Sequence, residues 1–315
     1  MIKINYSFPD MEALKNHLTE AYNLPFCVLD LYRAVRGALY IAYTPQKKYV
    51  FKLSDAYYAE KTINAVNLIT FLRKRNFPAV EIIPASKGEL YISIPMPEGN
   101  RIGVLYEFIE GKAATFDDIG EVGKTAARLH NEMNLYTGIM PNLYDKRLLI
   151  DELPKTLRLM RYDEDKTNDI ERMINALWDA IKAFPSGIVH GDFDVGNIII
   201  KDDGAITLID FDDGGRMPLI FDVACICSRI GDELLTKEKV ELTQKTIELF
   251  LNGYHAINPH AEFKTRDIMN WIALRRIDTQ MIGIRFLLQR RGKDNQYLFF
   301  DRTHKWLMDW EKMFL

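Results

Sequence analysis

The stretch VHGDFDVGNIIIKDDGAITLIDFDD, residues 189–213, decides the fold, because it surrounds a predicted β-hairpin with acidic side chains. Two apolar runs, NIII and ITLID, flank KDDGA, and the Asp203-Gly204 pair in that connection is a strong signal for a turn between two strands. Asn197 enters the first strand and Asp210 leaves the second. Antiparallel pairing therefore brings Asn197 and Asp210 to one end of the hairpin and leaves the acids of the turn in solvent at the other.

The residue types at the Asn197 end of the hairpin fit phosphoryl transfer. Mg²⁺ prefers oxygen ligands and usually takes one or two from the protein, with water and substrate phosphate completing its shell. Asn197 and Asp210 meet that demand, and Asp192, five residues before Asn197, can accept a proton from an attacking hydroxyl. The order His190-x-Asp192, then Asn197, then Asp210-Phe211 matches the order of catalytic Asp, metal Asn and metal Asp in protein kinases.

The details of this order resemble the aminoglycoside phosphotransferase and choline kinase superfamily, which transfers the γ-phosphate of ATP to hydroxyls on a kinase-like fold. The resemblance lies in His-Gly-Asp, an Asn five residues on, and Ile-Asp-Phe-Asp-Asp. It implies that Asp192 is the catalytic residue, that Asn197 and Asp210 hold Mg²⁺, and that His190 braces the loop. Asp222 in FDVAC resembles the Asp of the family's Asp-Leu-Ala, where a buried Asp supports the catalytic loop.

The remainder of the chain reads as a β-rich part followed by a helical part. A helix is predicted over residues 10–22 and a second from Ser54 as N-cap, among six predicted strands: FCVLDLYRAV, ALYIAY, YVFKL, AVEII, ELYISI and RIGVLYEFI. After EGK the pattern is helical almost throughout. We expect an α+β, bilobal, protein-kinase-like fold, with a nucleotide-binding lobe at 1–110 and a catalytic and acceptor-binding lobe at 111–315.

Residues that would bind ATP are expected in the β-rich part. In YVFKL, strand alternation puts Val50 and Lys52 on one face, where the lysine can aim its amine at phosphates. VLYEFIEG resembles the family's hinge, which implies that the backbone from Glu107 to Ile109 reads the edge of the adenine.

Two features depart from the family's pattern in this part. The predicted phosphate-binding loop, RAVRGALYIAY, contains only Gly37, so backbone amides are poorly placed to cradle phosphates. The family's spacing puts Ala65 where a helix Glu should pair with Lys52. Glu60 is the nearest acid on that helix, and two interpretations stay open: it pairs with Lys52, or it is solvated.

Composition excludes several classes of protein. Hydrophobic residues make up 48% of the 315, enough for a sizeable core, and a net charge of −3 gives no reason to expect a nucleic-acid partner. No apolar run approaches the roughly 20 residues needed to span a membrane. We expect a soluble cytoplasmic protein that uses ATP and Mg²⁺ to phosphorylate a hydroxyl of a small-molecule acceptor of the amino-acid-like, aminoglycoside or amino-alcohol class. The three cysteines are expected to be free, buried thiols.

Three alternatives share parts of this pattern. A metal-dependent hydrolase would use His190, Asp192 and Asp210 but would have no need of Lys52. A catalytically idle, kinase-like scaffold protein would account for the missing helix Glu and the sparse glycines. A Ser/Thr protein kinase of the same fold would use the same residues on a protein acceptor.

The late segment RRIDTQMIGIRFLLQRRGK gives the only hint about the acceptor. Its apolar residues recur at helical spacing, and Arg276, Arg285 and Arg290 border that stripe. Arginines in such positions either clamp a carboxylate with paired donors or cover the edge of the helix with their stems. The first interpretation predicts an anionic or zwitterionic acceptor in preference to a polycationic aminoglycoside. Two acceptor families then lead: hydroxyl amino acids such as homoserine, and Ser or Thr in peptides.

Overall fold

The computed structural model describes residues 7–34, 37–181, 183–230, 235–287 and 293–314, with the side chains of 148–149 and 278–299 excepted. Among these residues the class is α+β, as expected: strands dominate the first third and helices the rest. Within the described part of the chain, no helix is long and apolar enough to cross a membrane.

By their internal contacts, the described residues form two compact units. The first comprises Met1–Ala114, Leu135–Met140 and Gly196–Gly214, and the second comprises Thr115–Asn134, Pro141–Val195 and Gly215–Leu315. Lobes at 1–110 and 111–315 stay a prediction. By contacts, however, the hairpin groups with the N-terminal residues.

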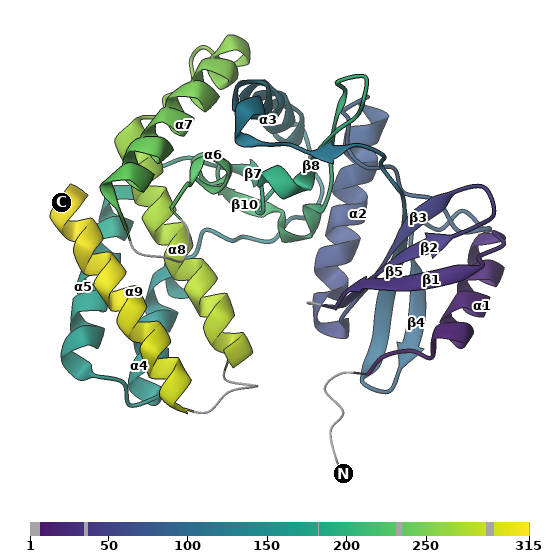
Figure 1. Cartoon of the computed structure of the whole chain (residues 1–315), viewed down its shortest axis with the longest axis horizontal. Coiled ribbons are helices and arrows are strands. Elements are labelled where there is room, and N and C mark those ends of the chain that lie inside the picture. Colours follow the sequence, from purple (N-terminus) through teal and green to yellow (C-terminus); the bar gives the residue numbers. More distant parts are fainter. Residues whose placement is uncertain (1–6, 35–36, 182, 231–234, 288–292, 315) are drawn as a thin grey trace. The chain divides into compact units, whose positions relative to one another are not determined.

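The first unit is built on a five-stranded antiparallel sheet in the order β1-β2-β3-β5-β4. Figure 1 shows α1 on one side of this sheet and α2 on the other. Side chains from α1 and from alternate strand positions, among them Leu18, Tyr40 and Phe51, make a buried core on the α1 side. The elements are α1 (Met11–Tyr22), β1 (Val28–Arg33), β2 (Gly37–Tyr43), β3 (Lys48–Ser54), α2 (Ala59–Lys74), β4 (Ile92–Met96), β5 (Gly99–Glu107), β6 (Lys112–Ala113), β8 (Ile198–Ile200) and β9 (Ile206–Leu208), with 3-10 turns η1 (Ala56–Tyr58), η4 (Val195–Asn197) and η5 (Phe211–Asp213).

Residues 78–83 explain why the hairpin belongs to the first unit. Their first half bonds to β9, through the N–H of Val80 to the carbonyl of Leu208 at 2.9 Å. Their second half bonds to β5, through the N–H of Ile83 to the carbonyl of Leu105 at 2.8 Å. One extended segment therefore ties the hairpin to the sheet, and isolated bridges replace the regular strand expected at AVEII, the fourth of the six predicted strands.

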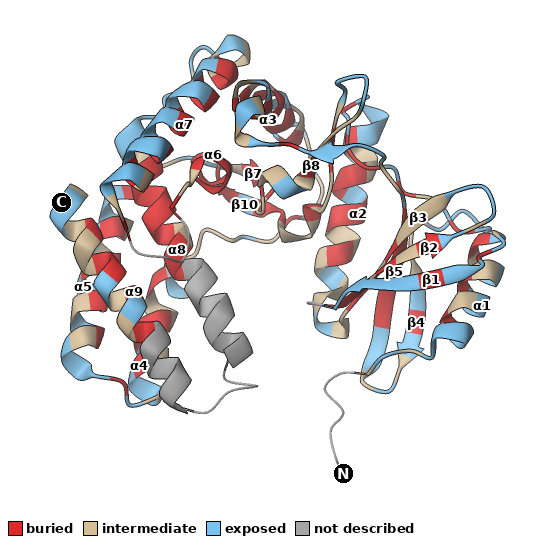
Figure 2. Ribbon diagram, in the orientation of Figure 1, coloured by how far each residue is buried: buried red, intermediate tan, exposed pale blue. Residues whose placement is uncertain are grey.

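The second unit packs helices around a short two-stranded sheet of β7 and β10. Every residue of α6 is buried (Figure 2), which fits its uniformly apolar sequence apart from Asp222. The elements are α3 (Ile119–Met133), α4 (Glu152–Leu159), α5 (Glu164–Ile181), β7 (Ser186–Val189), β10 (Gly215–Pro218), α6 (Ile220–Cys227), α7 (Lys237–Ile257), α8 (Thr265–Leu287) and α9 (Lys293–Phe314), with the 3-10 turn η2 (Phe116–Asp118) and the short π-helix η3 (Arg147–Asp151).

Two local predictions are wrong. Ser54 does not cap α2: it is the last residue of β3, and its hydroxyl donates to the carbonyl of Ile102 at 3.1 Å, so the helix begins only at Ala59. All three cysteines are free, but Cys27 is exposed, whereas Cys225 and Cys227 are buried as expected.

Helices α3 and α7 approach each other closely because glycines face the contact. A Cβ added at Gly253 would lie 1.9 Å from the carbonyl oxygen of Gly120, and one at Gly123 would lie 2.2 Å from that of Phe250. Both clashes are with backbone, which cannot move aside as a flexible side chain would.

We expect Gly253→Ala to destabilise the protein by about 1–3 kcal/mol, the usual cost of overpacking a well-packed core. This change should occur although alanine favours a helix over glycine by about 1 kcal/mol. Urea unfolding measures the free energy, and Asn252→Ala on the exposed side of the same helix is the matched control. Equal or greater stability of Gly253→Ala would contradict the close approach.

Candidate active site

The hairpin brings Asn197 and Asp210 together, as the sequence predicts. Ile198 is the partner of Leu208 in the register, and one step further the N–H of Ile209 donates to the carbonyl of Asn197 at 3.0 Å. Asp210 follows directly, with φ 61° and ψ 62°. A residue with a side chain rarely adopts this left-handed conformation, and such strain is concentrated at functional sites.

Lys52 is held between two carboxylates of the first unit. Its Nζ lies 2.7 Å from Oδ1 of Asp210 and 3.0 Å from Oδ2 of Asp212. Burial lowers the pKa of Lys52, but the two carboxylates outweigh burial and raise that pKa above its ordinary value. The ammonium therefore stays charged beside Asp210.

Asp212, and not Glu60, provides the second carboxylate for Lys52. Glu60 is exposed in the first turn of α2, and no ion pair joins it to Lys52 among the described residues. Helix α2 contributes instead through Thr62, whose hydroxyl donates to Asp212 at 3.3 Å, and through Lys61, which pairs with Asp213 at 3.3 Å. Asp212 and Asp213 thus hold α2, a role that sequence reasoning did not assign to them.

Arg33 is a second cation at Asp210, and a β-bulge places it there. Leu31 pairs with Tyr40, but the next partner of β2, Leu39, faces Arg33, so β1 carries one extra residue at Tyr32. Leu39 in turn pairs with Lys52 across β2 and β3. A bulge re-aims the residues that follow it, and the guanidinium of Arg33 lies 3.8 Å from Oδ2 of Asp210.

The expected hinge residues follow the end of β5. The N–H of Glu107 donates to the carbonyl of Glu81 at 2.9 Å, and Ile109 lies two residues beyond the strand, partly buried. Glu107 pairs with Tyr49, whose side chain points away from the face of Lys52 because strand residues alternate. Only backbone groups of Glu107 can therefore serve a ligand on the Lys52 face.

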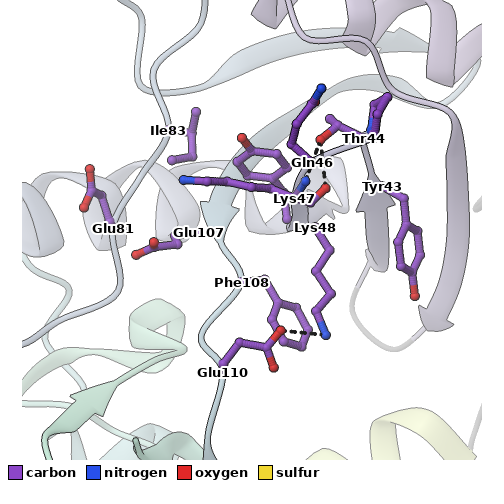
Figure 3. Close-up of a pocket in the computed structure, with 12 residues that line it drawn as sticks. Tyr43, Thr44, Gln46, Lys47, Lys48, Glu81, Ile83, Glu107, Phe108 and Glu110 are labelled. Carbon is purple, nitrogen blue, oxygen red and sulfur yellow. Dashed lines mark hydrogen bonds and ion pairs between the residues drawn. The ribbon is translucent and has the colours of Figure 1, made fainter. Parts of the chain in front are cut away.

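A cavity of about 580 Å³ lies at the end of β3 and β5, beside the side chain of Glu107. Tyr49 and the side chain of Glu107 line it together with the turn between β2 and β3 (Figure 3). Lys48 crosses its edge, with its ammonium 4.1 Å from the centre of the Phe108 ring and 2.8 Å from Glu110. This cavity is distinct from the cluster at Lys52.

In the second unit, a buried carboxylate fixes the loop that carries Asp192. Asp222 is fully buried, and its Oδ2 accepts from the N–H of His190 at 2.7 Å while its Oδ1 accepts from the N–H of Gly191 at 3.0 Å. Gly191 has φ 83°, which a residue with a side chain would rarely adopt. The bracing role that the family resemblance implies for Asp222 is confirmed.

His130 extends this support to a further helix, and sequence reasoning did not assign it a role. Its Nε2 lies 3.1 Å from Oδ2 of Asp222, and its Nδ1 lies 2.8 Å from the hydroxyl of Tyr254. The carboxylate can only accept, so Nε2 carries the hydrogen of that bond. Burial raises the pKa of Tyr254 to about 12, so its hydroxyl stays protonated.

Asp192 follows Gly191 directly in this braced loop, and its carboxylate is partly exposed. Its N–H donates to Nδ1 of His190 at 3.4 Å, and the His190 ring is fully buried beside Phe193, which fits a bracing role. The side chain of Asp192 is 43% exposed, enough for a ligand to reach it, and Oδ1 lies 3.5 Å from the guanidinium of Arg275.

The arginines expected to bind the acceptor lie elsewhere. Arg276 is buried and stacks 4.6 Å from the centre of the Trp306 ring, so it does not face Asp192. Arg285 and Arg290 lie outside the residues whose side chains are described. The neighbouring Arg275 was missed because the apolar stripe of the helix gave no reason to single it out.

The residues at the Asn197 end of the hairpin suit Mg²⁺, which takes only some of its ligands from the protein, better than a metal ion whose ligands are all protein side chains. Asn197 and Asp210 offer oxygen ligands from the same end of the two paired strands of the hairpin, and Mg²⁺ needs no more than one or two such ligands beside substrate phosphate. In the described part of the chain, no group of three or more His, Cys, Asp or Glu side chains is placed to hold a metal ion.

Comparison with known proteins identifies several that this chain resembles. The model of the phosphotransferase enzyme family matches residues 36–260. A homoserine kinase of Methylobacillus flagellatus is 22% identical over 234 residues, covering 70% of this chain and 67% of that protein. Among solved structures, a microcompartment-associated aminopropanol kinase has a TM-score of 0.76 at 16% identity, over 96% of this chain and 98% of that one. An amicoumacin kinase in complex with AMP-PNP, Ca²⁺ and Ami has a TM-score of 0.74 at 18% identity, over 96% and 94%.

Proposed function

Since the chain belongs to the phosphotransferase enzyme family, we propose that it transfers the γ-phosphate of ATP to a hydroxyl group of a small molecule. The observation that carries this proposal is the contact of Lys52 with Asp210 at 2.7 Å, which joins a strand lysine to the acid after the hairpin. Such a pair positions a phosphate-binding cation beside a metal-binding carboxylate.

Nucleotide binding is assigned to residues of the first unit. Lys52 and Arg33 would face the phosphates, and the backbone of Glu107 and Ile109 would bind the adenine edge. Asn197 and Asp210 would hold Mg²⁺, which, when bound, neutralises charge on the phosphoryl oxygens. Arg33 compensates for the shortage of glycines in the β1–β2 connection, because side-chain donors replace backbone amides.

Asp192 would orient the acceptor hydroxyl and accept its proton. Its backbone is fixed through Asp222 and His190, while its carboxylate is partly exposed. A base held in one orientation on a braced loop contributes by positioning, which is the main source of catalysis in phosphoryl transfer.

The alternatives find less support. A metal-dependent hydrolase would need His190 as an accessible group, but its ring is fully buried. An idle scaffold was suggested by the absence of a helix Glu to pair with Lys52. This argument is weaker because Asp212 provides a carboxylate 3.0 Å from Lys52 instead. The small-molecule kinases among the similar proteins favour a small acceptor over a protein one.

The proposal is tested by measuring ADP release from Mg²⁺-ATP with hydroxylated amino acids, amino alcohols, aminoglycosides and a Ser/Thr peptide. Release that depends on a small molecule supports it. Release with the peptide alone would support the protein-kinase alternative, and release with none of them would contradict phosphotransfer to a hydroxyl.

We expect Asp192→Asn to bind Mg²⁺-ATP as the wild type does but to transfer phosphate 10²–10⁴-fold more slowly, the usual contribution of a positioned base. The metal ligands and Lys52 are unchanged in this variant, so the loss should fall on the chemical step. Single-turnover transfer to the best acceptor measures it. A rate within about tenfold of the wild type would remove Asp192 from this role.

Two acids on the same hairpin form a matched pair for the metal assignment. Asp210→Ala should abolish Mg²⁺-dependent nucleotide binding, because it removes a proposed metal ligand and the partner of Lys52. Asp203→Ala, in the exposed turn at the other end, should change little. Calorimetric titration with AMP-PNP at several Mg²⁺ concentrations measures both, and equal losses would show that the hairpin end is not the metal site.

Arg33→Gln should raise the KM for ATP by about tenfold or more, since a hydrogen bond to a charged group contributes roughly 1.5–3 kcal/mol. The KM for the acceptor should stay unchanged. Lys87→Gln is the control, because Lys87 is exposed in the same unit and no ion pair joins it to Asp210 among the described residues. An unchanged KM for ATP would exclude Arg33 from phosphate binding.

A further inference from the structure

Arg275 of α8 is a charged side chain that the structure places against the proposed base. Its guanidinium lies 3.5 Å from Oδ1 of Asp192, and its side chain is only 24% exposed, against 43% for Asp192. The arginine therefore lies deeper than the carboxylate that it contacts. Both residues belong to the second unit, so this contact is internal to one compact part of the chain.

This position restricts what an acceptor can carry beside its hydroxyl. An acceptor must bring its hydroxyl to Asp192 within hydrogen-bond distance, about 2.8 Å. The acceptor atoms a few bonds from that hydroxyl then lie beside the guanidinium of Arg275. A planar guanidinium matches a carboxylate with two parallel N–H donors, whereas a positively charged amine at the same place is repelled.

We propose that Arg275 determines acceptor specificity by binding an anionic group, such as a carboxylate, that lies a few bonds from the acceptor hydroxyl. The enzyme accordingly selects a hydroxylated carboxylate over the corresponding amino alcohol. This inference rests on the proposed function, because it assumes that Asp192 receives the acceptor hydroxyl. Arg275, and not Arg276, is therefore the arginine that we expect to bind the acceptor, because Arg276 is buried against Trp306.

An alternative role for Arg275 is to position Asp192 without touching the acceptor. The two roles differ in one respect. A positioning residue supports transfer to every acceptor alike, whereas a specificity residue acts only on acceptors that carry the anion. Acceptors that differ only in a carboxylate therefore separate the two roles.

Matched pairs of acceptors make this test: homoserine with 3-amino-1-propanol, which is homoserine without its carboxylate, and serine with ethanolamine. Wild type, Arg275→Gln and Arg275→Lys are compared by kcat/KM, with choline and kanamycin as cationic acceptors. Arg266→Gln is the matched control, because Arg266 is exposed on the same helix. Thermal unfolding checks that each variant is folded.

We expect the wild type to favour the carboxylate-bearing member of at least one pair by about 30-fold or more, as a charge-assisted hydrogen bond allows. Arg275→Gln should lose most of that preference, with the amino alcohol changed less than about threefold, and Arg275→Lys should keep part of it. Arg266→Gln should behave as the wild type does.

Two results would overturn the inference while leaving phosphotransfer intact: an equal loss on both members of a pair in Arg275→Gln, or a wild-type preference for the amino alcohols, choline or kanamycin. Absence of ADP release with every acceptor would overturn the proposed function and this inference with it. The wild-type measurement thus tests the function, and the variants test Arg275.

Discussion

A lysine ammonium held between two carboxylates ties the sheet of the first unit to its hairpin. Lys52 comes from β3, and Asp210 and Asp212 follow β9, so the contact joins positions far apart in the chain. Each group alone would be costly to bury, and removing one partner would leave an uncompensated charge. The hairpin, the sheet and the start of α2 through Thr62 are consequently all placed by the same small group of charges.

In the second unit, buried hydrogen bonds fix the backbone of the loop at His190 and Gly191, while the side chain of Asp192 stays partly exposed. Asp222 accepts hydrogen bonds from two successive backbone N–H groups and lies against the ring of His130, so its buried charge is satisfied. Buried polar networks of this kind fix one geometry, because any arrangement that leaves one of their groups without a hydrogen bond is unfavourable. Because the backbone of His190 and Gly191 is fixed in this way, the position of Asp192, the next residue, is also fixed. Its carboxylate can therefore stay outside the core.

The sequence predicts these features where the physics is local. The hairpin follows from apolar runs around Asp203-Gly204, and the order of His190, Asp192 and Asn197 identifies the loop, because spacing along one short segment limits where side chains can go. It does not predict that Asp212 replaces a helix acid, because a pairing between distant segments leaves no trace in the periodicity of either. Arg33 depends on a bulge of one residue in β1, and such an insertion changes the register of the strand without changing its hydrophobic pattern.

Arg33 and Arg275 show how one arrangement recurs in both units. Each places a guanidinium against a carboxylate that we assign to the reaction, at 3.8 Å from Asp210 and 3.5 Å from Asp192. The same guanidinium can turn part of its planar fork of donors toward an incoming anion, because several N–H groups are available for one contact. We propose that the two guanidinium groups act in this way on different anions: Arg33 on a phosphate beside Asp210, and Arg275 on an anionic group of the acceptor beside Asp192.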